Sequence, residues 1–381
     1  EMDHWRKLVW ADKPVLPLDD PDGSFTVADT VVLSRTLAEE QTQSLLRDVS
    51  RAYRTDITDV LMTALARTFS DWSGNVETLL ELEGHGREIF SDKVDLSRTV
   101  GWFTSVYPVR LRYENGQSLQ DNLKSIKEQL RQIPNRGFGY GALRYLGTPE
   151  QRDELEQAPQ ADLVFNYLGQ FDSIIENNPW FTVAAEERGL EHSLESHDPH
   201  RLSINSHIVE GRLQVDWIYS DKVFKPQTIE RLATQYMRAL EQVIQHCTQT
   251  AVFGYTPSDF PLAKLDQQQI DRLVGKQRGI VSIYPLSPMQ EGMLFHSLFD
   301  NDTGVYFEQL SVEVIGNVDR DLLKQAWIQV VNRHPALRSA FVWQDLDRPL
   351  QIVYNRIDME VNEFDWRNID PAQEQHRLDV W

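Results

Sequence analysis

The chain has 381 residues, of which 41% are hydrophobic, 25% charged and 10% aromatic, a composition typical of globular proteins. Lys and Arg total 38 against 58 for Asp and Glu, and the net charge of -20 repels phosphate backbones and anionic lipid headgroups. No apolar stretch approaches the roughly 20 residues of a membrane-spanning helix. We therefore expect neither nucleic acid nor a membrane as partner. A single cysteine, Cys247, excludes an internal disulfide and fits a cytoplasmic setting.

Hydrophobic periodicity predicts alternating strands and helices over residues 1–247. Strands are expected at 27–34, 76–83, 107–113 and 161–167, and as a hairpin at 202–209 and 213–219. Helices are expected after a capping box at Thr36–Glu39, over 57–69, from Ser118 to just before Pro134, and from Pro226 to near Cys247. This alternation favours an α/β fold with a layered sheet.

Residues 248–279 have the character of an interdomain linker. They lose long periodicity, carry Pro257 and Pro261, and show only a short polar helix over 266–273. A second unit over 280–381 then restarts the pattern, with predicted elements as follows: helices at 288–298 and 319–333, and strands at 306–314, 339–343 and 349–354. Because the chain opens on Glu1 rather than Met and ends without a helix stop signal, we expect both ends to be cut from a longer protein.

The most specific local feature is the segment 82–88, which reads Leu-Glu-Gly-His-Gly-Arg-Glu. It places Glu83 at the carboxyl end of a predicted strand, the edge at which ligands bind to open α/β sheets. A Glu partly withdrawn from water has a raised pKa and can exchange a proton with a carbon acid. The alternative is a solvated strand end whose glycines only form a turn.

Three further segments are candidates for ligand contact. Residues 98–108 mix aromatic and hydroxyl side chains, which indicates either the wall of a tunnel with Thr104 or Ser105 as donors, or ordinary loop packing. The glycine-rich segment 134–141 lacks the lysine and preceding strand of a nucleotide site, and its glycines favour a close backbone approach or a turn. Asn166 and Tyr167 end a predicted strand, where an amide and a phenol can stabilise an oxyanion or simply pack in the core.

A cluster of histidines invites a metal hypothesis. His192, His197 and His200 lie near acidic residues in a polar stretch, but their spacing matches no zinc pattern. We expect a mobile acidic loop and no metal site. A serine nucleophile is not indicated either, because the sequence has no nucleophile elbow.

Taken in order, the segments 82–88, 98–108, 137–141 and 166–171 closely resemble the epimerization domains of nonribosomal peptide synthetases. The resemblance runs from Glu1 to about Cys247 and corresponds to the C-terminal half of such a domain. Downstream, the segments 284–295 and 333–341 resemble the opening of a condensation domain of the type that follows an epimerization domain and accepts a D-configured donor.

The resemblance implies a fold and a reaction. The fold is a pair of chloramphenicol acetyltransferase-like subdomains, here two partial copies joined by a linker. The reaction is inversion at the α-carbon of an aminoacyl or peptidyl thioester carried on the 4′-phosphopantetheine of a peptidyl carrier protein, with no cofactor bound directly. The implied partners are that carrier, an upstream adenylation domain, and downstream condensation and adenylation domains.

The resemblance also assigns residues. Glu83 matches the catalytic glutamate, and Asn166 and Tyr167 match pocket residues, of which Tyr167 is suited to hold the enolate or relay a proton. The resemblance assigns a supporting role, orienting Glu83 and its loop, to His85, Arg87 and Arg98. Thr104 and Ser105 are expected to border the pantetheine tunnel.

One hallmark of the family is missing, the paired-histidine motif His-His-x-x-x-Asp-Gly. The sequence has no adjacent histidines, and we expect the motif to lie before Glu1 for the first unit and beyond Trp381 for the second. The chain alone is therefore expected to be inactive. Two alternatives stay open: a noncatalytic carrier-docking module, and a free-standing CoA-dependent acyltransferase, which would need the complete motif.

Overall fold

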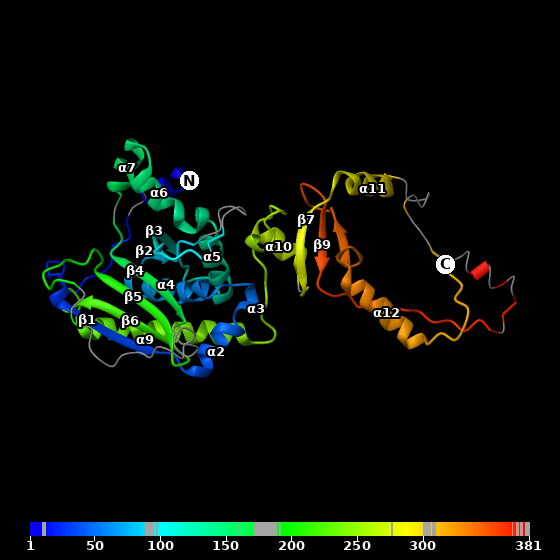
Figure 1. Cartoon of the computed structure of the whole chain (residues 1–381), viewed down its shortest axis with the longest axis horizontal. Coiled ribbons are helices and arrows are strands. Elements are labelled where there is room, and N and C mark those ends of the chain that lie inside the picture. The colour runs from blue at the N-terminus through cyan, green and yellow to red at the C-terminus, as the bar shows by residue number, and fades with distance from the viewer. Residues whose placement is uncertain are drawn as a thin grey trace. The chain divides into compact units, whose positions relative to one another are not determined.

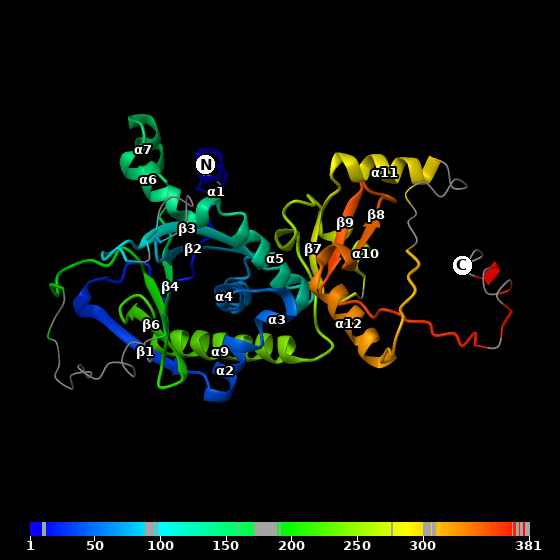
Figure 2. The same cartoon turned by 45° about the vertical axis from the view of Figure 1, so that its right-hand side comes forward.

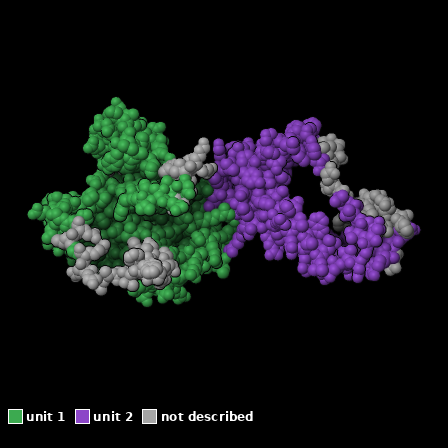
Figure 3. Space-filling model, in the orientation of Figure 1, with its two compact units in different colours: residues 1–258 green, residues 259–381 purple. Residues whose placement is uncertain are grey.

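Two compact units make up the computed structural model, residues 1–258 and 259–381 (Figure 3). The division between them falls within the stretch 248–279 that the sequence marks as a linker. The structure describes the following residues: 1–9, 13–87, 95–96, 98–158, 160–170, 189, 192–275, 277–299, 306, 310–367, 369–370, 373 and 376–377.

A six-stranded mixed sheet forms the centre of the first unit. In spatial order its strands are β1 (Thr30–Thr36), β6 (Arg212–Ser220), β5 (Leu202–Val209), β4 (Leu163–Gln170), β2 (Glu77–Gly84) and β3 (Ser105–Arg112). The three strands β5, β4 and β2 run parallel to one another. The other three pairs of neighbours, β1–β6, β6–β5 and β2–β3, are antiparallel. The predicted α/β class with a layered mixed sheet is confirmed.

Helices flank this sheet (Figures 1 and 2). Against one face pack α4 (Ile57–Ser73) and α9 (Pro226–Thr248), with α5 (Leu119–Arg131) beside them. Two short helices, α2 (Glu39–Arg47) and α3 (Ser50–Tyr53), contact α9. Near β3 lie three more: α1 (Met2–Val9), α6 (Phe138–Leu146) and α7 (Pro149–Glu156). Among the described helices none is both long and apolar enough to cross a membrane.

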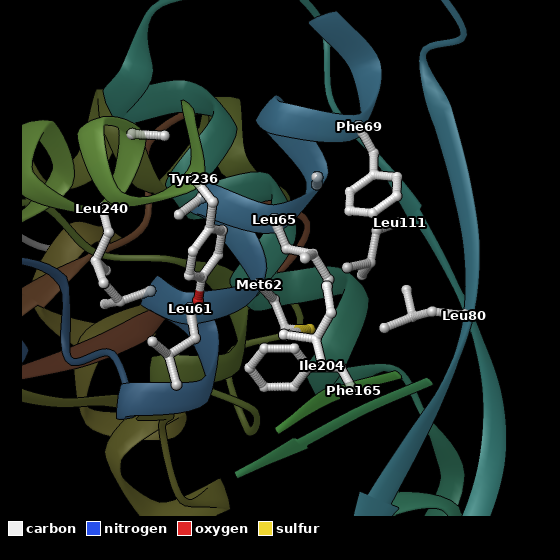
Figure 4. Packing of buried hydrophobic residues seen from close by; sticks show 14 of the residues in the cluster. Leu61, Met62, Leu65, Phe69, Leu80, Leu111, Phe165, Ile204, Tyr236 and Leu240 are labelled. Carbon is white, nitrogen blue, oxygen red and sulfur yellow. The ribbon is translucent and has the colours of Figure 1, made fainter. Parts of the chain in front are cut away.

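The core lies between the sheet and the helix pair α4 and α9. Alternate residues of β2, β4 and β5 point toward it, because successive strand side chains face opposite sides. Helix α4 is buried nearly all round, since it packs against the sheet, α9 and α5. Figure 4 shows the interlocking side chains: Leu80, Phe165 and Ile204 from strands, Leu61, Met62, Leu65 and Phe69 from α4, and Tyr236 and Leu240 from α9.

Local signals explain several element boundaries. Ser118 caps α5 by accepting a hydrogen bond from the Asp121 amide at 3.1 Å, as predicted. The β5–β6 turn uses left-handed conformations at Glu210 and Gly211, with φ of 51° and 70°. Such a turn matches the twist of an antiparallel hairpin, which is why the glycine signal located it.

Other local predictions are wrong. The expected capping box at Thr36–Glu39 does not form, because Thr36 still belongs to β1 and α2 begins at Glu39 after Ala38. Residues 27–29 form a 3-10 turn ahead of β1 instead of its first residues.

The glycine-rich segment is only partly as expected. Residues 134–137 form a 3-10 turn, and Gly137 has φ +83° with the Tyr107 ring 2.1 Å from where a Cβ would lie, so the turn and the close approach are confirmed. From Phe138 the chain forms α6, which was not predicted and which packs against β3 despite its glycines.

The first residues of the predicted linker are packed against the first unit. The Gly254 amide donates to the Ala52 carbonyl at 2.9 Å, and the Ser258 hydroxyl donates to Glu128 at 2.5 Å. Tyr255 and Thr256 are buried. Farther on, the expected polar helix appears as α10 (Gln267–Val274), where Asp266 accepts from the Gln269 amide. The lack of periodicity therefore reflects irregular backbone rather than a solvated tether.

The second unit carries a three-stranded antiparallel sheet in the order β7 (Ile280–Pro285), β9 (Leu350–Tyr354) and β8 (Ser339–Val342). Its helices are α11 (Pro288–Phe299) and α12 (Arg320–Arg333). Strand β7 was not predicted. The strand predicted at 306–314 is wrong over residues 310–314, which pair with no strand in the described chain, and 307–309 lie outside the described residues.

Candidate functional site

Parallel pairing of β2 with β4 brings together two polar side chains that are far apart in the sequence. Leu82 lies opposite Phe165 in the register, so Glu83 and Asn166 follow as neighbours at the carboxyl ends of their strands. The Asn166 Nδ2 amide donates a hydrogen bond to Glu83 Oε2 at 2.6 Å. The sheet therefore fixes the carboxylate with a neutral donor from the adjacent strand.

A cavity of about 500 Å³ opens at these strand ends. It contains five of the predicted site residues: Glu83, His85, Thr104, Asn166 and Tyr167. The side chains of Asn166 and Tyr167 point to opposite faces of β4, as neighbours in a strand must, and Tyr167 packs against the apolar core. Both reach the cavity because it lies beyond the end of the sheet.

The cavity favours the neutral forms of its acids. Burial raises the pKa of Glu83, and the nearby Glu81 carboxylate raises it further, while His200 and the Asn166 hydrogen bond act in the opposite direction. Burial also raises the pKa of the Tyr167 phenol, which therefore stays protonated at neutral pH. The cavity thus presents a carboxyl group that can exchange a proton and a phenol that can donate a hydrogen bond.

Arg87 shapes the loop that forms one wall. Its guanidinium donates to the carbonyls of Leu96 (3.3 Å), Thr99 (2.8 Å) and Gly101 (3.2 Å) and lies 4.8 Å from the centre of the Phe103 ring. Gly86 permits this approach, because its φ is +62° and a Cβ there would lie 1.5 Å from the Phe103 carbonyl oxygen. The same loop carries Trp102 and Thr104 to the cavity.

The cavity lining also includes an ion pair that was not predicted, in which the carboxylate is buried. Arg131 at the end of α5 donates to both carboxylate oxygens of Asp59, at 3.0 and 2.8 Å, and to Asp56 at 2.9 Å. Asp59 is fully buried, and its pKa is raised because burial outweighs the Arg131 charge. The pair joins the start of α4 to the end of α5 at the cavity. Its sequence signal was the capping box Asp56–Asp59.

Comparison with known proteins places this geometry in a family. The model of the Condensation domain family matches residues 1–265 and 280–381. The chain belongs to the condensation-domain family. The epimerization domain from the third module of tyrocidine synthetase B shares 36% identity and a TM-score of 0.59, over 65% of this chain and 55% of that one. The chloramphenicol acetyltransferase-like fold class is thereby confirmed.

Curated relatives are much longer than this chain. Linear gramicidin synthase subunits C and D of Brevibacillus parabrevis are 40% and 41% identical to it over 386 and 379 residues. Those alignments span 100% and 99% of this chain but only 5% and 7% of the two relatives. The chain is therefore similar to a small segment of each synthase.

Three predicted residues of this condensation-family domain are not among the described residues that line the cavity. Arg87 contacts the loop behind the wall, as described above. Arg98 is exposed in the same loop. Ser105 begins β3 opposite Gly84. His85 reaches the cavity, and its Nδ1 also accepts the Arg87 amide at 3.0 Å.

Sequence reasoning missed the surroundings of Glu83 on its own strand face. His200, expected in a mobile loop, is buried, and its Nε2 lies 2.9 Å from Glu81 Oε2. His197 instead contacts the Phe25 carbonyl, 3.1 Å from its Nδ1. Period-two alternation already indicated that Glu81 and Glu83 share a face, whereas nothing local linked His200 to β2. Within the described ranges no group of His, Cys, Asp and Glu has the arrangement of a metal site.

Proposed function

We propose that the first unit is the C-terminal half of an epimerization domain in a cytoplasmic nonribosomal peptide synthetase. The observation that carries the proposal is the Glu83 carboxyl, held by Asn166 at a cavity edge with a raised pKa. The 36% identity to a solved epimerization domain supports it. The reaction is inversion of the α-carbon of an aminoacyl or peptidyl thioester, from L to D and back.

The proposed chemistry is a proton exchange at carbon. The thioester acidifies the α-hydrogen, so a base whose pKa lies near the working pH can remove it. Glu83 takes the proton as its carboxylate or returns one as its acid; the Cα–H bond breaks, an O–H bond forms, and the electron pair moves to the thioester oxygen as an enolate. Tyr167 donates a hydrogen bond to that oxygen. A second acid on the opposite face, proposed to lie in the paired-histidine half, then gives a proton to the α-carbon; the enolate electron pair forms the new Cα–H bond, the thioester C=O is restored, and the centre is inverted.

The substrate arrives on a carrier protein as its 4′-phosphopantetheine thioester. The proposed path for the pantetheine arm follows the loop of residues 98–105, where Thr104 lines the cavity and Trp102 is 90% exposed. Ser105 borders the same path at the start of β3, and Arg87 with Arg98 and His85 supports the loop. The further partners in this proposal are an upstream adenylation domain and downstream condensation and adenylation domains.

For the second unit we propose the start of a condensation domain that accepts the D-configured donor. The family-model match over residues 280–381, separate from that over 1–265, supports two domain copies. In this proposal the first copy runs over 1–247 and the linker over 248–279. Inversion requires a second proton-exchanging group on the other face of the α-carbon, and we propose that the 381-residue chain alone does not turn over.

The proposal is tested by Glu83→Gln in a synthetase that contains this chain together with the paired-histidine half. The amide keeps the Asn166 contact but cannot accept a proton, so inversion of a carrier-bound aminoacyl thioester and α-deuterium exchange should fall by at least about 100-fold. Glu156→Gln, an exposed carboxylate on α7, is the control and should leave both unchanged. An unchanged inversion rate in Glu83→Gln would instead favour a noncatalytic carrier-docking module.

Activity of the chain by itself is measured in the same assay. Appreciable inversion by the 381 residues would contradict the need for the histidine half. Acyl transfer from CoA by the chain would favour the acyltransferase alternative. Carrier binding, measured by titration with a phosphopantetheinylated carrier domain, should survive Glu83→Gln, because the carboxyl acts on the substrate and not on the carrier surface.

A further inference from the structure

A chain of three polar groups lies beside Glu83 on the same face of the sheet. Asp198 accepts the His200 backbone amide at 2.9 Å, and its carboxylate lies 3.8 Å from His200 Nδ1. On the other side of the ring, His200 Nε2 lies 2.9 Å from Glu81 Oε2. The side chains of His200 and Glu81 are only 11% and 13% exposed. Each ring nitrogen of His200 therefore faces a carboxylate in a site largely withdrawn from water.

This arrangement matters because Glu81 and Glu83 point the same way from β2. Residues two apart along a strand are roughly 6.6 Å apart, and two like charges at such a distance in a partly buried site oppose each other's ionisation. His200, whose two ring nitrogens each face a carboxylate, is the side chain placed to offset that repulsion. Tyr140 on α6 interacts with Glu81, and Asn166 on β4 is neutral. The Asp, His and Arg side chains that line the cavity with Glu83 come from the loop after β2, the start of α4, and α5 with the turn after it: His85, Asp56, Asp59, Arg131 and Arg136.

We propose that His200 is a positioning residue for the proton exchange at Glu83: by binding Glu81 it neutralises the second carboxylate and leaves Glu83 as the single group of this strand face that gains and loses a proton. The inference rests on the function proposed for Glu83. His200 contacts Glu81 and acts on Glu83 through the electric field, so it need not touch substrate. Its place before β5, which pairs with β4, holds it beside β2.

The proposal predicts opposite effects for two neutralising substitutions. His200→Gln keeps a hydrogen-bond donor for Glu81 but removes the electrostatic effect of His200 that lowers the pKa of Glu83, so the pKa of Glu83 rises. Glu81→Gln removes a carboxylate that raises the pKa of Glu83 and leaves His200 without its carboxylate partner at Nε2, so that His200 acts on Glu83 alone and the pKa of Glu83 falls.

The direct test needs no turnover. Carbon-13 labelling of glutamate carboxyls in the 381-residue chain, with the Glu83 signal assigned by its loss in Glu83→Gln, allows the pKa of Glu83 to be measured by NMR. We expect an upward shift of about one pH unit in His200→Gln and a downward shift in Glu81→Gln. An unchanged Glu83 titration in a folded His200→Gln protein would overturn the proposal. If that variant does not fold, an unchanged titration in Glu81→Gln overturns it equally.

The second test is the pH dependence of α-deuterium exchange in the synthetase that contains this chain. In the direction in which Glu83 takes the proton, His200→Gln should move the acidic limb of the pH–rate profile to higher pH by the shift seen in NMR. A lower maximal rate without that movement would contradict the positioning role. The two proposals fail separately: exchange that survives Glu83→Gln removes the proposed function, whereas the NMR titration still decides whether His200 controls Glu83.

Discussion

At the scale of single residues, Glu83 couples the proposed chemistry to the stability of the fold. Burial holds its pKa above the ordinary value of 4.5, so between that value and the folded pKa the native state binds more protons than the unfolded state. The free energy of unfolding therefore falls as the pH rises through this window and levels off above the folded pKa. The ionised form of Glu83 therefore stabilises the first unit less than the neutral form does.

Glu83→Gln removes this dependence. We expect the variant to gain stability relative to the parent chain as the pH rises from 4.5, and to show no gain below it, where the parent carboxyl is already neutral. Urea unfolding followed by hydrogen exchange of β2 and β4 amides reports on the first unit alone. Glu156→Gln is the exposed control, and its free energy of unfolding relative to the parent chain should not change with pH. If that of Glu83→Gln does not change with pH either, burial does not act on this carboxyl.

At the scale of elements, an ion pair with a buried carboxylate links α4 to α5. Asp59 is completely buried and Arg131 is its cationic partner, so Arg131→Met should leave an uncompensated charge and destabilise the first unit by about 3–5 kcal/mol. The defect should shrink at acidic pH, because a protonated Asp59 needs no counterion. Arg112→Met is the matched control, since its partners Glu77 and Glu114 are partly exposed, and should cost about 1 kcal/mol or less. If urea unfolding gives the same loss of stability for both variants, the ion pair of Asp59 stabilises the fold no more than an exposed pair does.

Elements whose signals are local were predictable from the sequence. The cap at Ser118, the glycine turn at Glu210–Gly211 and the apolar face of α4 each depend on residues within one element. The errors arise where distant packing decides. α6 forms through contact with β3 despite its glycines, and 310–314 alternate in hydrophobicity without a partner strand in the described chain.

The candidate site divides in the same way. Glu83, Asn166 and Tyr167 were identified because each ends a strand with a distinctive motif, and parallel pairing then brings the first two together. His200 and Arg131 carry no motif, and only the packing of β5 beside β4 and of α5 beside α4 places them near the cavity. A residue that acts through another residue leaves little signal in the sequence.

At the scale of the whole molecule, the two units differ in how they treat apolar side chains. Helix α4 buries Phe69 in the core, whereas α11 has no buried residue and exposes Phe295 and Phe299 by 61% and 80%. The two α11 rings stack on each other, with centroids 5.8 Å apart. Exposed apolar surface of this kind favours association and dye binding.

The contrast predicts opposite outcomes for the same substitution. Phe299→Ser on α11 should change the free energy of unfolding by no more than about 0.5 kcal/mol and lower both anilinonaphthalene sulfonate fluorescence and self-association of the chain. Phe69→Ser on α4 should cost about 3–5 kcal/mol and raise the fluorescence, because it opens the core. Urea unfolding, dye titration and light scattering on the 381-residue protein measure the three quantities. A loss of 2 kcal/mol or so in Phe299→Ser would mean that α11 packs its aromatic face in solution, since surface substitutions do not reach that value.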